Sequence, residues 1–212
     1  MTGSLKVYPS ARASAALMLA HGAGAGQLSH FMVLAAHELA GRGVTTATFD
    51  FPYIVHKRKV PDRGPVLESA WRSALAEARE HPACAGLPLF IGGKSMGGRI
   101  ASQVAASGEG VDDVRGLVFL GYPLHPSGRP DQRRDRHLPS IRVPMLFVQG
   151  TRDAFGTADE IRSLMPTLTA PAELVGIKNG DHSFKVPARS GVKAQDVLGD
   201  AFDAVAAFVK RS

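Results

Sequence analysis

Four glycines surround one serine in the stretch at 88–99, which reads PLFIGGKSMGGR. Its central pentapeptide at 93–97, GKSMG, matches the pattern Gly-x-Ser-x-Gly. In that pattern the serine occupies a strained turn between a strand and a helix, with its hydroxyl raised above the sheet. The positions two before and two after must be small, because side chains there would collide across the turn. Ser95 is therefore a candidate nucleophile.

The same stretch contains the Lys-Ser pair that ends a phosphate-binding loop. That loop has the pattern Gly-x-x-x-x-Gly-Lys-Ser/Thr, so a glycine should stand five positions before Gly93. That position is Pro88, which lies inside the preceding apolar run. The segment that would wrap a phosphate is missing, and a phosphate-binding loop is excluded.

A serine hydroxyl is a weak nucleophile unless a base takes its proton and an acid orients the base. On a sheet with such a turn, the acid and then the histidine follow the serine along the chain. LFVQGTRDAFG places Asp153 just past one apolar run, and VGIKNGDHSF places His182 just past the next. Asp153 could equally serve as a helix cap or turn residue, a role compatible with catalysis. We expect Ser95, Asp153 and His182 to meet at one edge of the sheet.

An oxyanion formed by attack on a carbonyl needs two hydrogen-bond donors. One is expected from the backbone N–H of Met96, directly after the nucleophile. The second is expected from the segment LMLAHGAGAG at 17–26, where Ala23 is the first choice and Gly24 the next. A dinucleotide-binding loop is the rival interpretation of this segment, but Gly-x-Gly-x-x-Gly is not completed, because Ser29 stands at the third glycine position.

The chain alternates short apolar runs with helical patterns, which is typical of a parallel sheet covered on both faces. We predict one α/β domain over 1–212, with a doubly wound, mostly parallel sheet and no large cap domain. The predicted strands are 5–8, 16–20, 44–49, 87–92, 116–121, 144–150 and 172–177. The predicted helices are 29–42, 66–80, 95–107, 157–165 and 193–210.

The long segment between Gly121 and Pro144 is rich in proline and arginine. It is either a rim of the site or a solvated connection. The basic stretches at 56–59 and 129–136 follow strand ends, and if they border the pocket, esters carrying a carboxylate or phosphate should be preferred. A solvated basic face is the alternative. The candidates for the substrate rim are His21, His125, Arg133 and Arg134.

Composition limits the class of protein. The net charge is +6, but the basic residues are scattered without the aromatic pattern of an RNA-binding surface, so no nucleic-acid partner is expected. Cys84 is the single cysteine, which rules out a disulfide within the chain. No apolar run is long enough to cross a bilayer, so no membrane partner is expected and a soluble cytoplasmic protein is predicted. No cofactor or metal is expected either, because no cysteine–histidine cluster is present.

Several motifs together resemble the α/β-hydrolase superfamily, and more narrowly its small lidless branch, which includes the TEX- and KANL-type proteins and the dienelactone-hydrolase-like proteins. The motifs are HGAGAG at 21–26, FDFPY at 49–53, GGKSMGGR at 92–99, GYPLHPSGRP at 121–130, VPMLFVQGTRDAFG at 143–156 and GDHSF at 180–184. The chain departs from dienelactone hydrolases proper, which carry cysteine at the position of Ser95.

The resemblance implies Ser95 as nucleophile, Asp153 as orienting acid and His182 as base. The expected activity is hydrolysis of a small carboxylic ester or thioester through an acyl-enzyme. The KANL-type members act within chromatin assemblies, so a non-catalytic binding module on the same fold is the alternative. The occupied positions of all three residues argue against it. The oligomeric state is left open.

Overall fold

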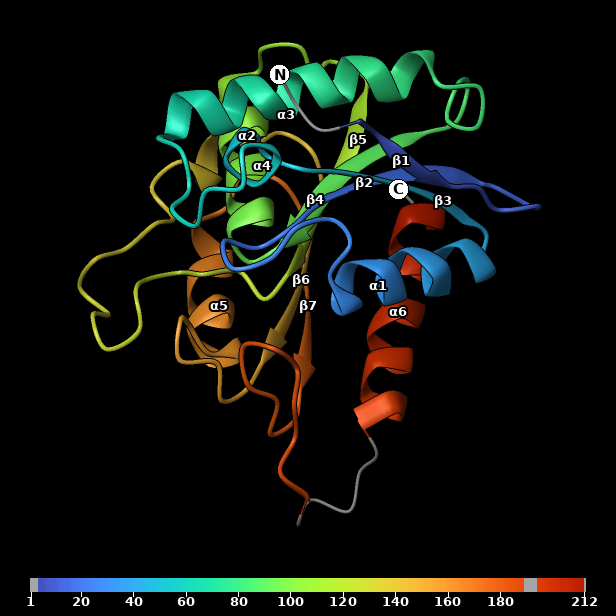
Figure 1. The fold of residues 1–212 in the computed structure, drawn as a ribbon. Coiled ribbons are helices and arrows are strands. Elements are labelled where there is room, and N and C mark those ends of the chain that lie inside the picture. The colour runs from blue at the N-terminus through green and yellow to red at the C-terminus, as the bar shows by residue number, and fades with distance from the viewer. Residues whose placement is uncertain (1–3, 189–193, 212) are drawn as a thin grey trace.

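The computed structural model describes residues 4–188 and 194–211. In this part of the chain seven strands form one sheet in the order β1-β3-β2-β4-β5-β6-β7 (Figure 1). β1 pairs with β3 in the antiparallel sense, and all other neighbours are parallel. The strands are β1 (Lys6–Tyr8), β2 (Ala15–Ala20), β3 (Val44–Phe49), β4 (Leu89–Lys94), β5 (Val114–Leu120), β6 (Met145–Gly150) and β7 (Ala172–Ile177).

The seven predicted strands are all present, with small shifts at their ends. The largest shift concerns β4, which we predicted to end at residue 92. β4 continues to Lys94 because β5 runs beside it up to the turn. Gly93 pairs with Phe119, and Lys94 pairs with Leu120. The strand therefore delivers the chain directly to Ser95.

The predicted helices are present as well. They are α1 (His30–Gly41), α3 (Gly64–Glu80), α4 (Met96–Ser107), α5 (Ala158–Leu164) and α6 (Ala194–Arg211). Residue 193, where we predicted the last helix to begin, lies outside the described residues. The short α2 (Pro52–Val55) and the 3₁₀ turns Leu138–Ser140 and Met165–Thr167 were not predicted, because three or four residues carry no periodic pattern.

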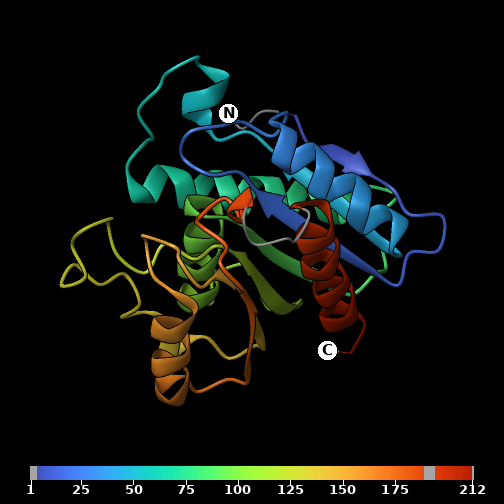
Figure 2. The same ribbon diagram turned by 90° about the horizontal axis from the view of Figure 1, so that it is seen from below.

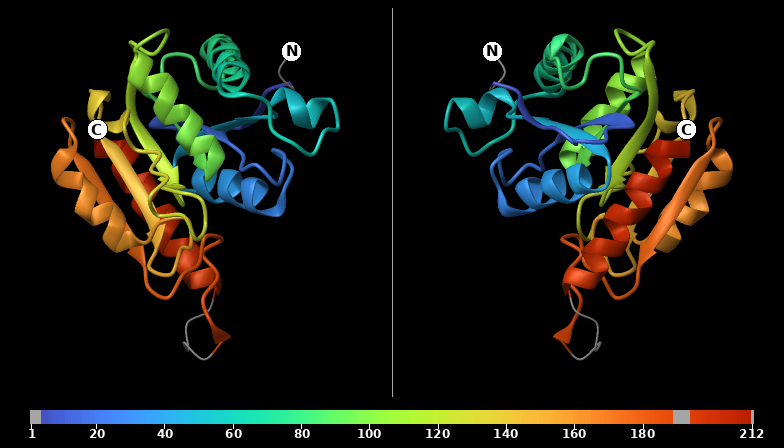
Figure 3. Two further views of the ribbon diagram at one scale, coloured as in Figure 1. Left: turned by 90° about the vertical axis from the view of Figure 1, so that its left-hand side faces the viewer. Right: turned by 90° about the vertical axis from the view of Figure 1, so that its right-hand side faces the viewer.

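Both faces of the sheet are covered by helices. Along β2, Met18 packs into a cluster with α3 and α4, whereas the neighbouring Leu17 and Leu19 pack into one with α1 and α6. This alternation follows from the two-residue period of a strand. Figure 2 shows α1 beside α6, and in Figure 3 the first strands lie between α3 and α1. The predicted fold class is confirmed, and no large cap domain interrupts the described elements.

The long segment between β5 and β6 is partly built into the fold. Tyr122 is buried, and its hydroxyl donates to the carbonyl of Arg134 at 2.9 Å. Further along, Leu138 is fully buried, and His137 Nε2 lies 2.7 Å from Ser102 Oγ on α4. The segment is therefore anchored to α4, the helix that follows Ser95. A purely solvated connection would not have these buried contacts.

The His137 anchor predicts acid sensitivity. Burial lowers the pKa of His137 from 6.5 to about 4, with the positive Arg99 acting in the same direction. The folded protein therefore keeps this ring neutral at pH values where the unfolded chain protonates it. Its stabilising contribution is complete above pH 6.5 and is lost as the pH falls toward 4. We expect the free energy of unfolding to fall by about 1–2 kcal/mol more in wild type than in His137→Gln over this window.

Urea unfolding of both proteins at a series of pH values measures this difference. Parallel curves for wild type and His137→Gln would show that the ring is not held neutral by the fold.

Candidate active site

Ser95 occupies a strained backbone conformation between β4 and α4. Its φ is 51° and its ψ is −117°, a positive-φ conformation that residues other than glycine adopt rarely. The backbone N–H of Ser95 donates to the carbonyl of Leu120 at 3.1 Å, which ties the turn to the end of β5. Strain of this kind persists only where the surroundings enforce it, and it concentrates at functional sites.

The glycines beside Ser95 are required by close packing against the end of β2. A Cβ atom on Gly93 would lie 2.3 Å from the Ala20 carbonyl oxygen, and one on Gly97 would lie 2.2 Å from the same atom. The sequence argument expected collisions across the turn itself. The Gly93 Cβ would indeed lie 3.0 Å from the Gly97 carbonyl carbon, but the shorter contacts are with β2. The neighbouring strand thus sets the requirement for glycine.

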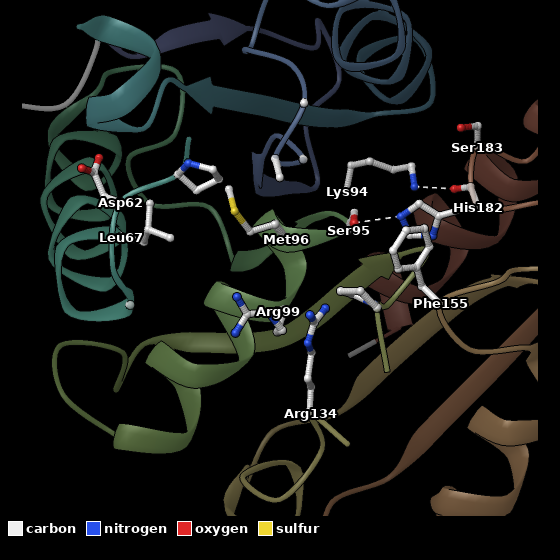
Figure 4. Close-up of a pocket in the computed structure, with 16 residues that line it drawn as sticks. Asp62, Leu67, Lys94, Ser95, Met96, Arg99, Arg134, Phe155, His182 and Ser183 are labelled. Atoms are coloured by element: carbon white, nitrogen blue, oxygen red, sulfur yellow. Dashed lines mark hydrogen bonds between the residues drawn. The ribbon is translucent and has the colours of Figure 1, made fainter. Parts of the chain in front are cut away.

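The structure brings Ser95, His182 and Asp153 into one chain of hydrogen bonds. His182 Nε2 lies 2.8 Å from Ser95 Oγ, and His182 Nδ1 lies 2.7 Å from Asp153 Oδ2. Figure 4 shows the first of these contacts at the pocket. The three residues follow β4, β7 and β6, so they meet at the carboxyl edge of the parallel sheet, where open α/β sheets bind ligands.

The carboxylate of Asp153 is buried and fully engaged. Its Oδ1 accepts from the Phe155 N–H at 2.8 Å, and its Oδ2 also accepts from the Gln149 side-chain amide at 2.9 Å. Gln149 is itself buried and bonds to both the N–H and the carbonyl of Tyr122. Sequence reasoning missed Gln149, although a glutamine inside the apolar run of β6 was a signal. These bonds hold the carboxylate in one orientation toward His182.

Lys94 is a second residue that sequence reasoning left without a role. Its Nζ donates to the backbone carbonyl of His182 at 2.5 Å (Figure 4). It also lies over the ring of Phe184, 5.2 Å from the centroid. Burial lowers the pKa of Lys94 from 10.5 to about 8, against the opposing attraction of Asp153 and Asp181. Lys94 thus connects the end of β4, directly before Ser95, to the loop that carries His182.

The two backbone amides predicted to bind an oxyanion, those of Ala23 and Met96, have no acceptor in the part of the chain that the structure describes. Both residues line the pocket. The loop that carries Ala23 is held by Tyr53, whose hydroxyl donates to the Ala23 carbonyl at 3.0 Å. His21 adds a second support, because its Nε2 accepts from the Phe51 N–H and its Nδ1 donates to the Gly22 carbonyl.

The pocket around Ser95 has a volume of about 570 Å³. Of the residues predicted for its rim, only Arg134 lines it, together with Arg99, which sequence reasoning missed. Three expectations were wrong. His21 is fully buried beneath the loop, His125 is buried with its Nε2 3.0 Å from Glu160, and Arg133 is paired with Asp135 outside the pocket.

The described residues contain no cluster of three or more His, Cys, Asp or Glu side chains placed to hold a metal ion. None of their helices has both the length and the apolar character needed to cross a membrane.

The contact between the glycines and β2 predicts a large loss of stability on substitution. In Gly97→Ala the new methyl group would overlap the Ala20 carbonyl, and backbone cannot move aside cheaply. We expect a loss of about 3 kcal/mol or more in the free energy of unfolding, or no folded protein. Gly41→Ala is the control, because a Cβ at this helix end meets nothing within 4 Å, and denaturant unfolding should show a change below about 1 kcal/mol. Equal effects of the two substitutions would contradict the prediction.

The depressed pKa of Lys94 predicts how stability changes in alkaline solution. Between about pH 8 and 10.5 the unfolded chain keeps the lysine proton that the folded protein has lost, so stability rises with pH. Relative to Lys94→Met, wild type should gain about 1–3 kcal/mol in the free energy of unfolding across this window. Urea titrations at pH 7.5, 9 and 10.5 measure the difference. A constant difference at all three would contradict the assignment.

Comparison with known proteins identifies the family to which this chain belongs. The model of the alpha/beta hydrolase domain family matches residues 13–210. Among solved structures, a dienelactone hydrolase from Anabaena variabilis is similar at 23% identity with a TM-score of 0.71, over 96% of this chain and 95% of that one.

Two further structures share the fold at lower identity. Est1E from Butyrivibrio proteoclasticus is similar at 13% identity with a TM-score of 0.71, over 100% of this chain and 99% of that one. A serine hydrolase without lid from Xanthomonas campestris is similar at 20% identity with a TM-score of 0.68, over 96% of this chain and 91% of that one. The chain belongs to the alpha/beta hydrolase domain family and has the lidless, dienelactone-hydrolase-like form of its fold.

Proposed function

We propose that the protein is a serine hydrolase that cleaves a small carboxylic ester or thioester through a covalent acyl-enzyme. The observation that carries the proposal is the hydrogen-bond chain from Ser95 through His182 to the buried Asp153. Ser95 and His182 line a pocket together with Ala23 and Met96, whose amides have no acceptor among the described residues. Membership of the alpha/beta hydrolase domain family supports the same activity.

In the first half of the reaction His182 Nε2 takes the Ser95 proton as Oγ attacks the carbonyl carbon. Asp153 stabilises the imidazolium through Nδ1–H and keeps the ring in the required tautomer. The backbone N–H groups of Ala23 and Met96 donate hydrogen bonds to the developing oxyanion, an interaction worth about 3–4 kcal/mol per donor in comparable sites. His182 then passes its proton to the leaving oxygen or sulfur, and the acyl group stays on Ser95.

In the second half a water molecule attacks the acyl carbon while His182 removes its proton. The tetrahedral intermediate collapses, the Ser95 oxygen recovers the proton from His182, and the acid is released. The same two amides serve both halves, since the oxyanion forms at the same place. This sequence of proton transfers needs no group beyond the residues named and the water.

Labelling with a fluorophosphonate tests the nucleophile. Wild type should be labelled, and Ser95→Ala should not. With p-nitrophenyl esters, Asp153→Asn should lower kcat by about 10⁴ because the histidine loses the partner that fixes its tautomer. Folded wild-type protein that is neither labelled nor active on esters and acyl thioesters would favour the non-catalytic binding module.

A further inference from the structure

Two arginines line the wall of the pocket that contains Ser95. Arg99 lies in the first turn of α4, where its N–H donates to the Ser95 carbonyl at 3.1 Å. Arg134 comes from the segment between β5 and β6. Figure 4 shows both side chains on one side of the pocket, below Met96 and Ser95 in that view. The inference drawn from them rests on the proposed function, because it concerns the substrate of the same site.

Neither arginine is neutralised by the protein. Within the described residues no carboxylate lies within 4.0 Å of either guanidinium. The Arg99 side chain donates only to the neutral amide of Gln103, at 3.3 Å, and the Arg134 side chain makes no hydrogen bond there. By contrast, Arg133 is paired with Asp135.

The two positive charges are also unfavourable for each other. Burial is the main cause that lowers the pKa of Arg99, and attraction from Tyr122 opposes it. The like charge of Arg134 lowers the pKa further, against a smaller attraction from Glu68. Partly buried like charges are costly unless an anion joins them. Paired guanidinium groups present flat arrays of donors that match the oxygens of a carboxylate or a phosphate.

The backbone beneath Arg134 is fixed in place. Its N–H donates to the Leu124 carbonyl at 2.8 Å, and its own carbonyl accepts from the buried Tyr122 hydroxyl at 2.9 Å. A binding group on a fixed backbone is ordered before the ligand arrives, which lowers the entropic cost of binding.

The acidic residue of the pocket lies elsewhere. Asp62 is at the far end with Leu67, beyond Met96 from Ser95 in Figure 4. It is paired with Arg58 at 2.6 Å, so it is not the partner of Arg99 or Arg134. The pocket is therefore positive on the side of these two arginines.

We propose that Arg99 and Arg134 bind an anionic oxygen group, a carboxylate or a phosphate, that the substrate carries in addition to its scissile ester or thioester. Anionic acyl compounds are then the preferred substrate class, and the two arginines determine the specificity.

The test compares the mono-p-nitrophenyl ester of adipic acid with p-nitrophenyl heptanoate, which has a similar length and no charge. The measured quantity is the ratio of their kcat/KM values. We expect wild type to prefer the anionic ester, and Arg99→Gln and Arg134→Gln each to lower the ratio about tenfold, as for a lost charge-assisted hydrogen bond. Arg133→Gln removes the same charge one residue away, outside the pocket, and should leave the ratio within about twofold of wild type.

An unchanged ratio in Arg134→Gln, or an equal fall in Arg133→Gln, would overturn the proposal. Arg134 lies on a surface segment, so this variant is informative even if Arg99→Gln does not fold; fluorophosphonate labelling checks that each variant retains its site.

Direct binding separates this proposal from the proposed activity and distinguishes the two anions. Calorimetric titration of Ser95→Ala with adipate and with phenyl phosphate needs no turnover. We expect one of the two to bind and its Kd to rise about tenfold when Arg134→Gln is added. Binding of adipate identifies a carboxylate site, and binding of phenyl phosphate a phosphate site. Absence of binding by both anions would refute the anion site even in an active hydrolase, whereas binding without any esterase activity would refute only the hydrolase.

Discussion

The site depends on one steric constraint, the contact of the turn at Ser95 with the end of β2. The Ala20 carbonyl lies so close to Gly93 and Gly97 that neither can carry a side chain. This contact determines how closely the turn at Ser95 packs against the end of β2, and Met96 lines the same pocket as the loop that follows β2. Ser95, Met96 and the loop that carries Ala23 thus all follow the same pair of neighbouring strands, β2 and β4.

The site is also surrounded by buried polar groups that form hydrogen bonds with one another and with the backbone. Gln149 bonds to Asp153 and to the backbone at Tyr122, and His21 joins the loop after β2 to the loop after β3. A buried polar group that lost its partner would cost about 1–3 kcal/mol. The supporting network is consequently rigid, whereas Arg99 and Arg134, which have no carboxylate partner among the described residues, line the wall of the pocket.

The sequence predicted the fold because its signals were local and strong. Apolar runs and helical periodicity located the strands and the main helices, and Gly-x-Ser-x-Gly located the turn at Ser95. The proximity of Asp153 and His182 was predictable because carboxyl ends of parallel strands share one edge.

Rim residues were less predictable, because position in a loop does not determine where a side chain points. His21 and His125 follow strands as expected, yet their hydrogen bonds draw them inward. Arg133 and Arg134 are adjacent in sequence, and only the second lines the pocket. Arg99 was overlooked because helical periodicity identifies buried faces, whereas its position depends on how α4 meets the long segment.

The bond from Lys94 to the His182 carbonyl has a consequence for how such a site can vary. Lys94 supports the loop that carries His182, and the next residue, Ser95, supplies the oxygen atom that the His182 ring contacts. A shift of the loop after β7 would therefore disturb both contacts at once, through one short piece of backbone. Insertions and deletions are better tolerated in the segment between β5 and β6, whose tip near Gly128 has open space around it. Changes in chain length are therefore easier to accommodate at the edge of the pocket than at its centre.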